Sequence, residues 1–246
     1  MKNFLKIFLV TLVIFTPSLF SQITLQAGGG VGLVMPAGDF GGTTQDFYNG
    51  TAYGLSNGLN LHGKVRAGVL GFTLVGELGY VSLENSGVAT NDNKGKVKVK
   101  TKIFSVKIGP EVSFSVPALP LKPYIGGNLS LNNFSGDFRI QGMTKVPADK
   151  FTIQSTSRIG FGLNGGVMFK LNELMSIDVA LQYNMMNVYG KEYRDRNPLK
   201  EQPVDAYLAL NDDKDPLYRI ANEDHFISKS RTINSLVLSV SLMLGL

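Results

Sequence analysis

The stretch that decides the fold is Ile103-Phe-Ser-Val-Lys-Ile-Gly-Pro-Glu-Val-Ser-Phe-Ser-Val116, in which almost every second residue is apolar. Even positions from Phe104 to Val116 are apolar, whereas the odd positions that follow Ile103 are small, polar or charged. A period of two belongs to a β-strand, because successive side chains of a strand point to opposite faces. The stretch therefore predicts a strand with one apolar face and one polar face.

The same alternation recurs along the chain and predicts seven further strands. They cover residues 23–33, 53–66, 72–80, 124–131, 158–169, 177–185 and 235–244. Short connections are expected near residues 68–71, 118–121 and 171–174, and long ones near residues 36–50, 84–95, 135–150 and 190–230. This pattern is typical of an all-β fold: an eight-stranded antiparallel up-and-down transmembrane β-barrel with short periplasmic turns and long extracellular loops.

The aromatic residues on the apolar faces give a check on dimensions. Phe72 and Tyr80 are eight residues apart, and Phe104 and Phe114 are ten apart. On strands tilted near 40° these separations rise roughly 20–25 Å, close to the height of about 25 Å of the apolar band of such barrels. We expect a periplasmic girdle of Phe72, Phe114 and Phe169 and an outer girdle of Tyr53, Tyr80, Phe104 and Tyr183. The alternative is a soluble, lipocalin-like barrel with its apolar faces inside.

The first 21 residues have the pattern of a signal peptide. Lys2 and Lys6 precede an apolar stretch, residues 7–20, and small residues around Ser21 suit cleavage before Gln22. An uncleaved anchor is the alternative. We interpret residues 22–246 as one outer-membrane β-barrel domain.

Composition excludes several other classes. The chain has no cysteine, which excludes a lipoprotein anchor, disulfides and thiolate metal sites. The formal net charge is +5, or +3 without the two lysines of the leader. A charge this small and scattered does not indicate nucleic acid binding.

Several motifs carry a resemblance to a known family. They are the segment Gly28-Gly-Gly-Val-Gly-Leu-Val-Met-Pro-Ala-Gly-Asp-Phe40, the pair Gly79-Tyr80 and the closing run Leu236-Val-Leu-Ser-Val-Ser-Leu242. The chain resembles the small eight-stranded outer-membrane β-barrel family of the OmpA and OmpX type. The resemblance implies the outer membrane of a Gram-negative bacterium, contact with its lipid, and insertion by the barrel-insertion machinery.

Two departures from that family pattern stand out. The chain ends in Leu246 rather than in an aromatic residue, and Pro110 lies inside a membrane strand, where we expect a bulge.

Charged residues on the inward faces form the first candidate site. Four cations and three carboxylates share this face: Lys64, Arg66, Lys107, Arg158, Glu77, Glu111 and Asp178. Eight strands leave an interior only just wide enough for side chains, and buried charges there must pair. We expect a salt-bridged plug that stabilises the barrel. The alternative is a narrow or gated pore.

A stripe of lysines forms the second candidate site. Lys96, Lys98, Lys100 and Lys102 have the phase of Phe104, so they would point outward just above the outer girdle. That height corresponds to the phosphates of lipopolysaccharide, and each cation near such an anionic surface contributes about 1 kcal/mol. We expect a lipopolysaccharide contact, and a solvated hairpin is the equal alternative.

Catalytic, cofactor and metal sites find little support. The two histidines are His62, which faces inward, and His225, which follows Asp224 in the last loop. The glycines at 28, 30 and 32 lack the spacing of a dinucleotide fingerprint. Residues 212–215 contain three aspartates but not the glycine and distant glutamate of an EF-hand. We therefore expect no cofactor, no metal and no enzyme, with a lipid hydrolase that uses His62 as a remote alternative.

The loop of residues 190–230 is the best carrier of a specific function. It mixes both charge signs with aromatic residues, namely Tyr193, Tyr207, Tyr218 and Phe226. We expect it to cap the mouth, with a short helix at residues 206–210, and to offer a surface to an extracellular partner. A loose spacer is the alternative. The sequence thus favours a structural or surface-interaction protein over a small porin-like pore.

Overall fold

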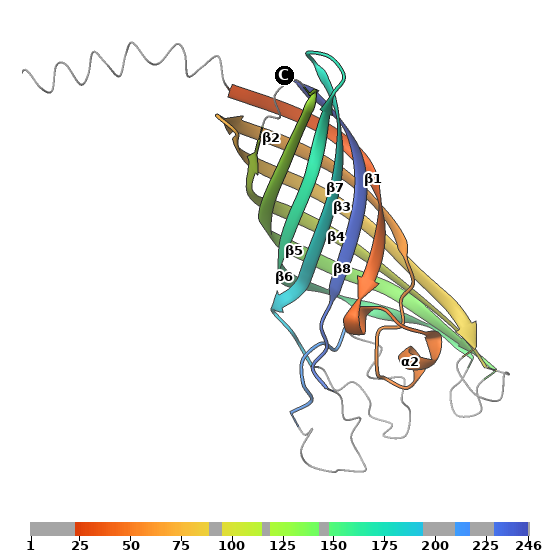
Figure 1. Ribbon diagram of the computed structural model, residues 1–246. Helices are drawn as coiled ribbons and strands as arrows, with labels where there is room; N and C mark the ends of the chain where they lie inside the picture. Colours follow the sequence, from red (N-terminus) through yellow and green to blue (C-terminus); the bar gives the residue numbers. More distant parts are fainter. Residues whose placement is uncertain are drawn as a thin grey trace, which may run out of the picture.

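The computed structural model describes residues 23–88, 95–114, 119–142, 148–193, 210–216 and 229–245. Within these ranges the chain forms one closed barrel of eight antiparallel strands in sequence order, in which β1 pairs with both β2 and β8 (Figure 1). The strands are β1 (Ile23–Ala37), β2 (Gly58–Val69), β3 (Phe72–Val88), β4 (Lys96–Ser113), β5 (Leu121–Gln141), β6 (Asp149–Lys170), β7 (Met175–Tyr189) and β8 (Asn234–Gly245). A 3-10 turn η1 (Gly38–Phe40) and a short helix α2 (Thr44–Tyr48) lie between β1 and β2.

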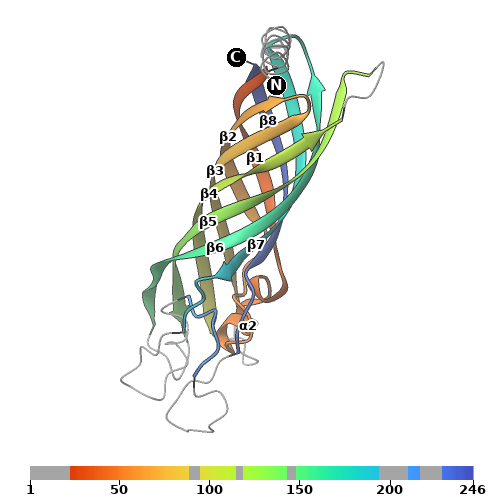
Figure 2. The same cartoon turned by 90° about the vertical axis from the view of Figure 1, so that its left-hand side faces the viewer.

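Short turns join the strands at one end of the barrel, which is the periplasmic end. The turn between β2 and β3 has only two residues, Leu70 and Gly71, with φ of 54° and 87°. Two successive positive φ values are what the tightest hairpins require, because their twist matches that of the strands. The start of β1 and the end of β8 lie at the same end, as an even strand number demands (Figure 2).

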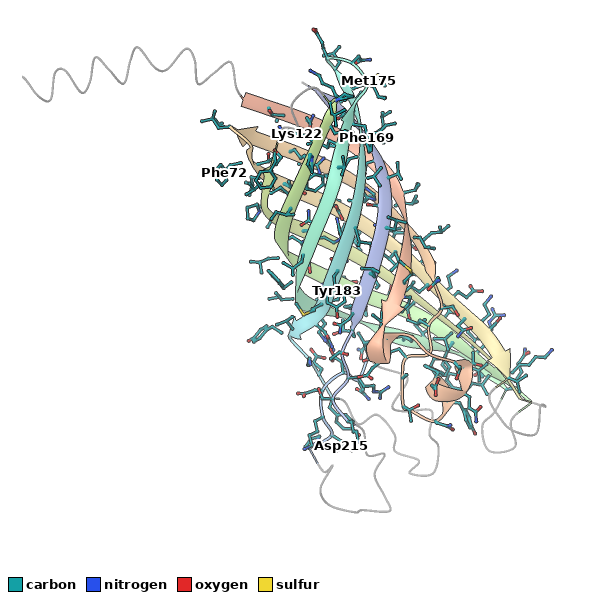
Figure 3. The ribbon with its side chains drawn as sticks, in the orientation of Figure 1. Phe72, Lys122, Phe169, Met175, Tyr183 and Asp215 are labelled. Carbon is teal, nitrogen blue, oxygen red and sulfur yellow. The ribbon has the colours of Figure 1, made fainter. Side chains whose placement is uncertain are left out.

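The apolar faces point outward between the short turns and the level of Phe104, which we call the membrane part of the barrel, so the prediction of the facing is confirmed. Leu163 is 54% exposed and Phe72 is 68% exposed, whereas Lys64 and Asp178 are buried inside. Figure 3 shows Phe72 and Phe169 near the end with the short turns and Tyr183 nearer the other end. Leu238 and Val106 are likewise exposed on the outside, which excludes a soluble barrel with an apolar core at this level.

Four neighbouring strands reach well into the loops that the sequence pattern predicted on the extracellular side. β3, β4, β5 and β6 continue outward, so residues 84–88 of the first expected loop and residues 135–141 and 149–150 of the other are strand. We call residues 81–88, 96–103, 133–141 and 149–157 the extracellular extension. Figure 2 shows these strands reaching farther than their neighbours at the end that carries α2.

The inside of the extracellular extension is apolar. Its inward side chains pack against η1, α2 and the residues that follow them, in one cluster that includes Phe40, Phe47, Leu83, Val97, Val99, Ile103, Phe134, Phe138 and Ile140. Phe138 lies between Phe47 and Phe151, with ring centroids 5.2 and 5.1 Å away. The first extracellular loop therefore closes the barrel with an ordinary hydrophobic core.

Two sequence predictions in this region are wrong. Tyr53 and Leu55 do not face lipid: β2 begins only at Gly58, and both side chains are buried in the same apolar cluster. Alternation placed them in a strand, but the positive φ of Gly54 lets the chain turn inward there. The expected bulge at Pro110 is also absent, because the register of β3 with β4 runs through it unshifted. Among the described residues, register shifts occur instead at Phe134/Gly136 and Ile159/Phe161.

Candidate functional site

The interior of the membrane part holds a connected network of charges. Glu77 accepts from Lys107 at 2.9 Å and lies 3.7 Å from Lys64, which in turn donates to Asp178 at 3.0 Å. Arg66 continues the chain of contacts, since it donates to Asp178 at 3.0 Å and to Glu111 at 2.9 Å. These six groups come from β2, β3, β4 and β7. Every cation in the network has a carboxylate partner, as a narrow low-dielectric interior requires.

Neutral side chains complete the network. The Tyr124 hydroxyl donates to Asp178 at 2.6 Å, and its ring lies 4.8 Å beneath the Arg66 guanidinium. Gln182 accepts from Lys107 and donates to Glu77, and Asn164 donates to Glu111 at 2.8 Å. A cavity of about 20 Å³ lies beside Glu77, Lys107 and Glu111, which is room for about one water molecule.

Glycines on β1 make this crowding possible. At Gly30, an added Cβ would lie 2.2 Å from the Val240 carbonyl oxygen and 2.6 Å from the Ser241 hydroxyl. Because Gly30 has no side chain, His62 on β2 reaches across β1 to Ser241 on β8, with 2.7 Å between Nε2 and Oγ. The glycine spacing of two therefore has a packing role, because it opens space inside the barrel.

Arg158 does not join the network to which the sequence assigned it. It lies nearer the outer mouth and binds Asp212 of the last loop through Nε and Nη2, at 2.9 and 2.8 Å. Asn187 and the Glu192 backbone amide also donate to Asp212. No local pattern could have linked Arg158 to a carboxylate 54 residues away in an irregular segment.

Residues 210–212 of the last loop are packed into the mouth of the barrel. Leu210 and Asp212 are buried, and the Tyr53 hydroxyl donates to the Asn211 carbonyl oxygen at 3.0 Å. Burial raises the pKa of Tyr53, so this hydroxyl keeps its proton and its hydrogen bond well above neutral pH. The expected helix at 206–210 lies outside the described residues except for Leu210, which is in a turn.

The lysine stripe points outward from the extracellular extension. Lys98 and Lys100 face Glu84 on β3, at 2.6 and 4.0 Å, while Lys96 and Lys102 have no carboxylate within 4 Å among the described residues. On the other side Lys98 is opposite Arg139 of β5, and Arg139 is opposite Lys150 of β6. Three cations thus stand in one row across three strands, and the sequence pattern missed the last two because residues 135–150 read as a loop.

Of the residues considered for catalysis or metal binding, the structure describes His62, Asp212, Asp213 and Asp215. His62 is buried with Ser241 inside the lumen, while Asp224 and His225 lie outside the described residues. No group of three or more metal-ligating side chains is present in the described ranges. Asp212 already binds Arg158 and Asn187, so it is not available to a calcium ion beside Asp213 and Asp215.

The outer girdle has a member that the pattern overlooked. Tyr189 at the end of β7 is 72% exposed and lies opposite the lipid-facing Ile159. Tyr189 keeps the odd phase of the outward-facing Tyr183, but the strand predicted from the sequence ended at residue 185, so Tyr189 was not assigned to it.

Comparisons with known proteins agree with this architecture. Residues 78–198 match a family model described as Opacity family porin protein. Among solved structures, OprG from Pseudomonas aeruginosa is similar at 12% identity and a TM-score of 0.50, over 91% of this chain and 95% of that one. Neisserial surface protein A aligns at 14% identity and a TM-score of 0.48, over 91% and 97% of the two chains. Ail from Yersinia pestis aligns at 12% identity and a TM-score of 0.40, over 90% and 97%. No curated protein has a significantly similar sequence.

The fold, the family-model match and the likeness to OprG define the class: the chain is a small eight-stranded outer-membrane β-barrel protein. Its central part, residues 78–198, is similar to the Opacity family porins. The described residues contain no helix long and apolar enough to cross a membrane.

Proposed function

We propose that the protein is a non-enzymatic surface barrel whose basic outer face binds lipopolysaccharide. In this proposal residues 1–21 are a cleaved signal peptide, residues 22–246 are the barrel domain, and the barrel-insertion machinery places it in the outer membrane. The row of Lys98, Arg139 and Lys150 is the observation that carries the lipopolysaccharide contact.

The electrostatics of that row favour an anionic partner. Like charges directly opposite on neighbouring strands destabilise a sheet, and Glu84 and Asp137 offset only part of the charge. Phosphate groups over the row would turn the repulsion into charge-assisted hydrogen bonds. The stripe begins at Lys102, directly beyond the lipid-facing Phe104, which is the level of the headgroups.

The same geometry favours a sealed barrel over a pore. The charge network fills the membrane part, and the apolar cluster with Leu210 and Asp212 fills the mouth. In a planar bilayer we expect no conductance above background, and discrete channel openings would contradict the sealed interior.

Lipopolysaccharide retention tests the headgroup contact. Replacing Lys96, Lys98, Lys100 and Lys102 with glutamine should lower the co-purified lipopolysaccharide severalfold, because each cation contributes about 1 kcal/mol near an anionic surface. The control is the pair Lys191→Gln and Lys229→Gln, which removes cations that lie outside the stripe. Unchanged retention in the stripe variant would refute the contact.

An enzymatic alternative has a direct test. His62 and Ser241 are buried within the lumen, away from the lipid-facing surface. Ester release from lipopolysaccharide should therefore be undetectable, and release that a His62→Ala substitution abolishes would establish a hydrolase instead. The loop 190–230 remains our candidate for binding an extracellular partner.

A further inference from the structure

The row of Lys98, Arg139 and Lys150, which we call the cation row, lies beyond the headgroups of the membrane. Lys98 is six residues beyond Phe104, the last apolar side chain on the outside of β4. At about 3.3 Å per residue and a tilt near 40°, six residues rise about 15 Å. The headgroup region on each side of a bilayer is only about 5–8 Å thick. The cation row is therefore farther out than the phosphates of lipid A, the membrane-embedded part of lipopolysaccharide.

The height of each cation decides which anionic groups it can reach. Lys102 is two residues beyond Phe104 and rises about 5 Å, so it lies at the level of the lipid A phosphates. The cation row lies about 10 Å farther from the hydrocarbon than Lys102. At physiological ionic strength, attraction between exposed charges is screened over about 8 Å. The cation row therefore contributes little to binding lipid A, and its anionic partner must lie at a greater height.

The cation row faces sideways from the barrel. Its three side chains are exposed on the outer face of the extracellular extension, whereas their neighbours Val99 and Phe138 point inward and are buried. Figure 2 shows the four extended strands continuing beyond the other strands. A row on this outer face meets the molecules that surround the barrel rather than a molecule that approaches the mouth from above. In an outer membrane those molecules are lipopolysaccharide, and above lipid A they present their sugar core.

The charge of the cation row is compensated only in part. A carboxylate oxygen of Glu84 lies 2.6 Å from Lys98 Nζ. A carboxylate oxygen of Asp137 lies 3.7 Å from Lys150 Nζ. Arg139, which lies opposite both lysines in the sheet, has no carboxylate within 4 Å among the described residues. The centre of the row is thus an exposed guanidinium that is free to bind an anion.

Other carboxylates at the tip of the extension do not neutralise this face. Its outward positions hold six cations and two carboxylates, namely Lys96, Lys98, Lys100, Lys102, Arg139, Lys150, Glu84 and Asp137. Asp149 has the phase of the inward Phe151, and its carboxylate accepts from the Lys150 backbone amide at 2.7 Å. Residues 89–94 and 143–147 lie outside the described residues, and their sequences contain one aspartate and two lysines. The formal charge around the cation row is therefore positive.

All three side chains of the cation row are accessible to a ligand. The side chains of Lys98 and Lys150 are 49% and 51% exposed, and Arg139 is exposed between them. Neighbouring strands are about 4.8 Å apart, so the row is about 10 Å long. A guanidinium can bind a phosphate or carboxylate through two parallel hydrogen bonds, and a lysine on each side adds charge. The row can therefore contact two anionic groups of one ligand at the same time.

We propose that the cation row binds the sugar core of lipopolysaccharide through phosphate or carboxylate groups on its sugars. This inference rests on the proposed lipopolysaccharide contact and divides that contact between two heights. Lys102 and the adjacent Lys100 bind the phosphates of lipid A, and the cation row binds the charged sugars above them. Arg139 forms the bidentate contact, and the two lysines hold the neighbouring anionic group.

The test measures the two parts of lipopolysaccharide separately. The mature chain in detergent is titrated by calorimetry with lipid A, and in a second experiment with the core oligosaccharide freed from lipid A. Arg139→Gln with Lys150→Gln should weaken binding of the core oligosaccharide about tenfold and leave binding of lipid A unchanged. The matched control is Lys100→Gln with Lys102→Gln, which removes the same charge from the same face and should weaken binding of lipid A only. Heat-modifiable migration on gels checks that each barrel is folded.

The pattern of losses separates this inference from the proposed function. If the Arg139 and Lys150 variant loses affinity for lipid A and not for the core, the inference fails while the lipopolysaccharide contact stands. Equal losses for both ligands in both variants would show attraction by charge alone and would also overturn the division into two heights. If neither variant changes either affinity, the inference and the proposed contact both fail.

Two further ligands test the chemistry of the partner. A core oligosaccharide stripped of its phosphates and with its carboxylates reduced should bind at least tenfold more weakly than the charged core, and equal binding would overturn the inference. Dextran sulfate represents a soluble polyanion that reaches the protein from outside. If the Arg139 and Lys150 variant loses affinity for dextran sulfate but keeps its affinity for the core, the cation row serves a soluble partner and the inference fails.

Discussion

The two ends of β4 have opposite polarity on both faces. Near the periplasm its inward residues are polar, such as Lys107 and Glu111, and its outward residues are apolar, such as Val106 and Ile108. In the extracellular extension the inward residues Val97 and Val99 are apolar, and the outward residues are lysines. The alternation keeps one phase throughout, and only the chemistry of each face changes.

This inversion shows that one strand passes from hydrocarbon into water. Where hydrocarbon surrounds the barrel, outward apolar groups cost nothing and the interior must satisfy its own charges. Beyond the headgroups water surrounds the barrel, so the extension buries apolar side chains and exposes charge, like any soluble sheet. Phe104 and Lys102 on the outside, and Ser105 and Ile103 on the inside, mark the boundary.

The largest effect should come from removing the carboxylate that joins two cations in the membrane part. Asp178→Leu leaves Lys64 and Arg66 buried without their shared partner, and we expect a loss of about 3–5 kcal/mol of unfolding free energy. Urea titration in detergent measures it. The matched control is Asp137→Leu in the extension, where an exposed contact with Lys150 contributes about 1 kcal/mol or less. Equal losses would break the comparison.

A core substitution in the extension should act locally. Phe138→Ala removes a ring that is fully buried between Phe47 and Phe151, at an expected cost of about 3–5 kcal/mol to the extension. Amide hydrogen exchange should accelerate in α2 and at the outer ends of β3 and β4, while the membrane part keeps its protection. Global unfolding would show instead that the two regions form one cooperative unit.

Outward positions on β6 allow a paired test of the surroundings. Leu163→Arg puts a charge into lipid and should cost about 2–4 kcal/mol. Thr152→Arg, which also points outward but lies in the extension, should change the stability by about 0.5 kcal/mol or less. Refolding into lipid vesicles under urea measures both. Similar costs would place Thr152 in lipid and refute the proposed boundary.

The smallest effect concerns helix α2, which lies over the mouth of the barrel. Hydrogen bonds from the Thr43 hydroxyl and backbone amide lower the pKa of Asp46 in the capping box of α2. Because the folded pKa is depressed, this stabilisation is complete above the ordinary value of 3.8 and is lost as the pH falls through the folded pKa. Amide exchange in α2 should therefore accelerate at acidic pH beyond its intrinsic rate, and Asp46→Asn should remove that dependence.

The pattern of residues predicted much of the membrane part. Seven charges were expected inside, and the structure places all of them there, because a period of two assigns a face without knowledge of the fold. The contacts among the inward residues were harder to predict. Nothing in the sequence indicates that Tyr124 lies against Arg66 and Asp178. Its role depends on three strands that meet only when the barrel closes.

The sequence by itself determined the strand number, the facing of each strand and the surrounding medium, since alternation and apolar content are local properties. Only the tertiary structure decided where the barrel ends and what closes it. Tyr53 binds Asn211 of the last loop, and Asp212 binds Arg158 of β6. Such contacts between residues far apart in the sequence depend on how the chain returns across the mouth.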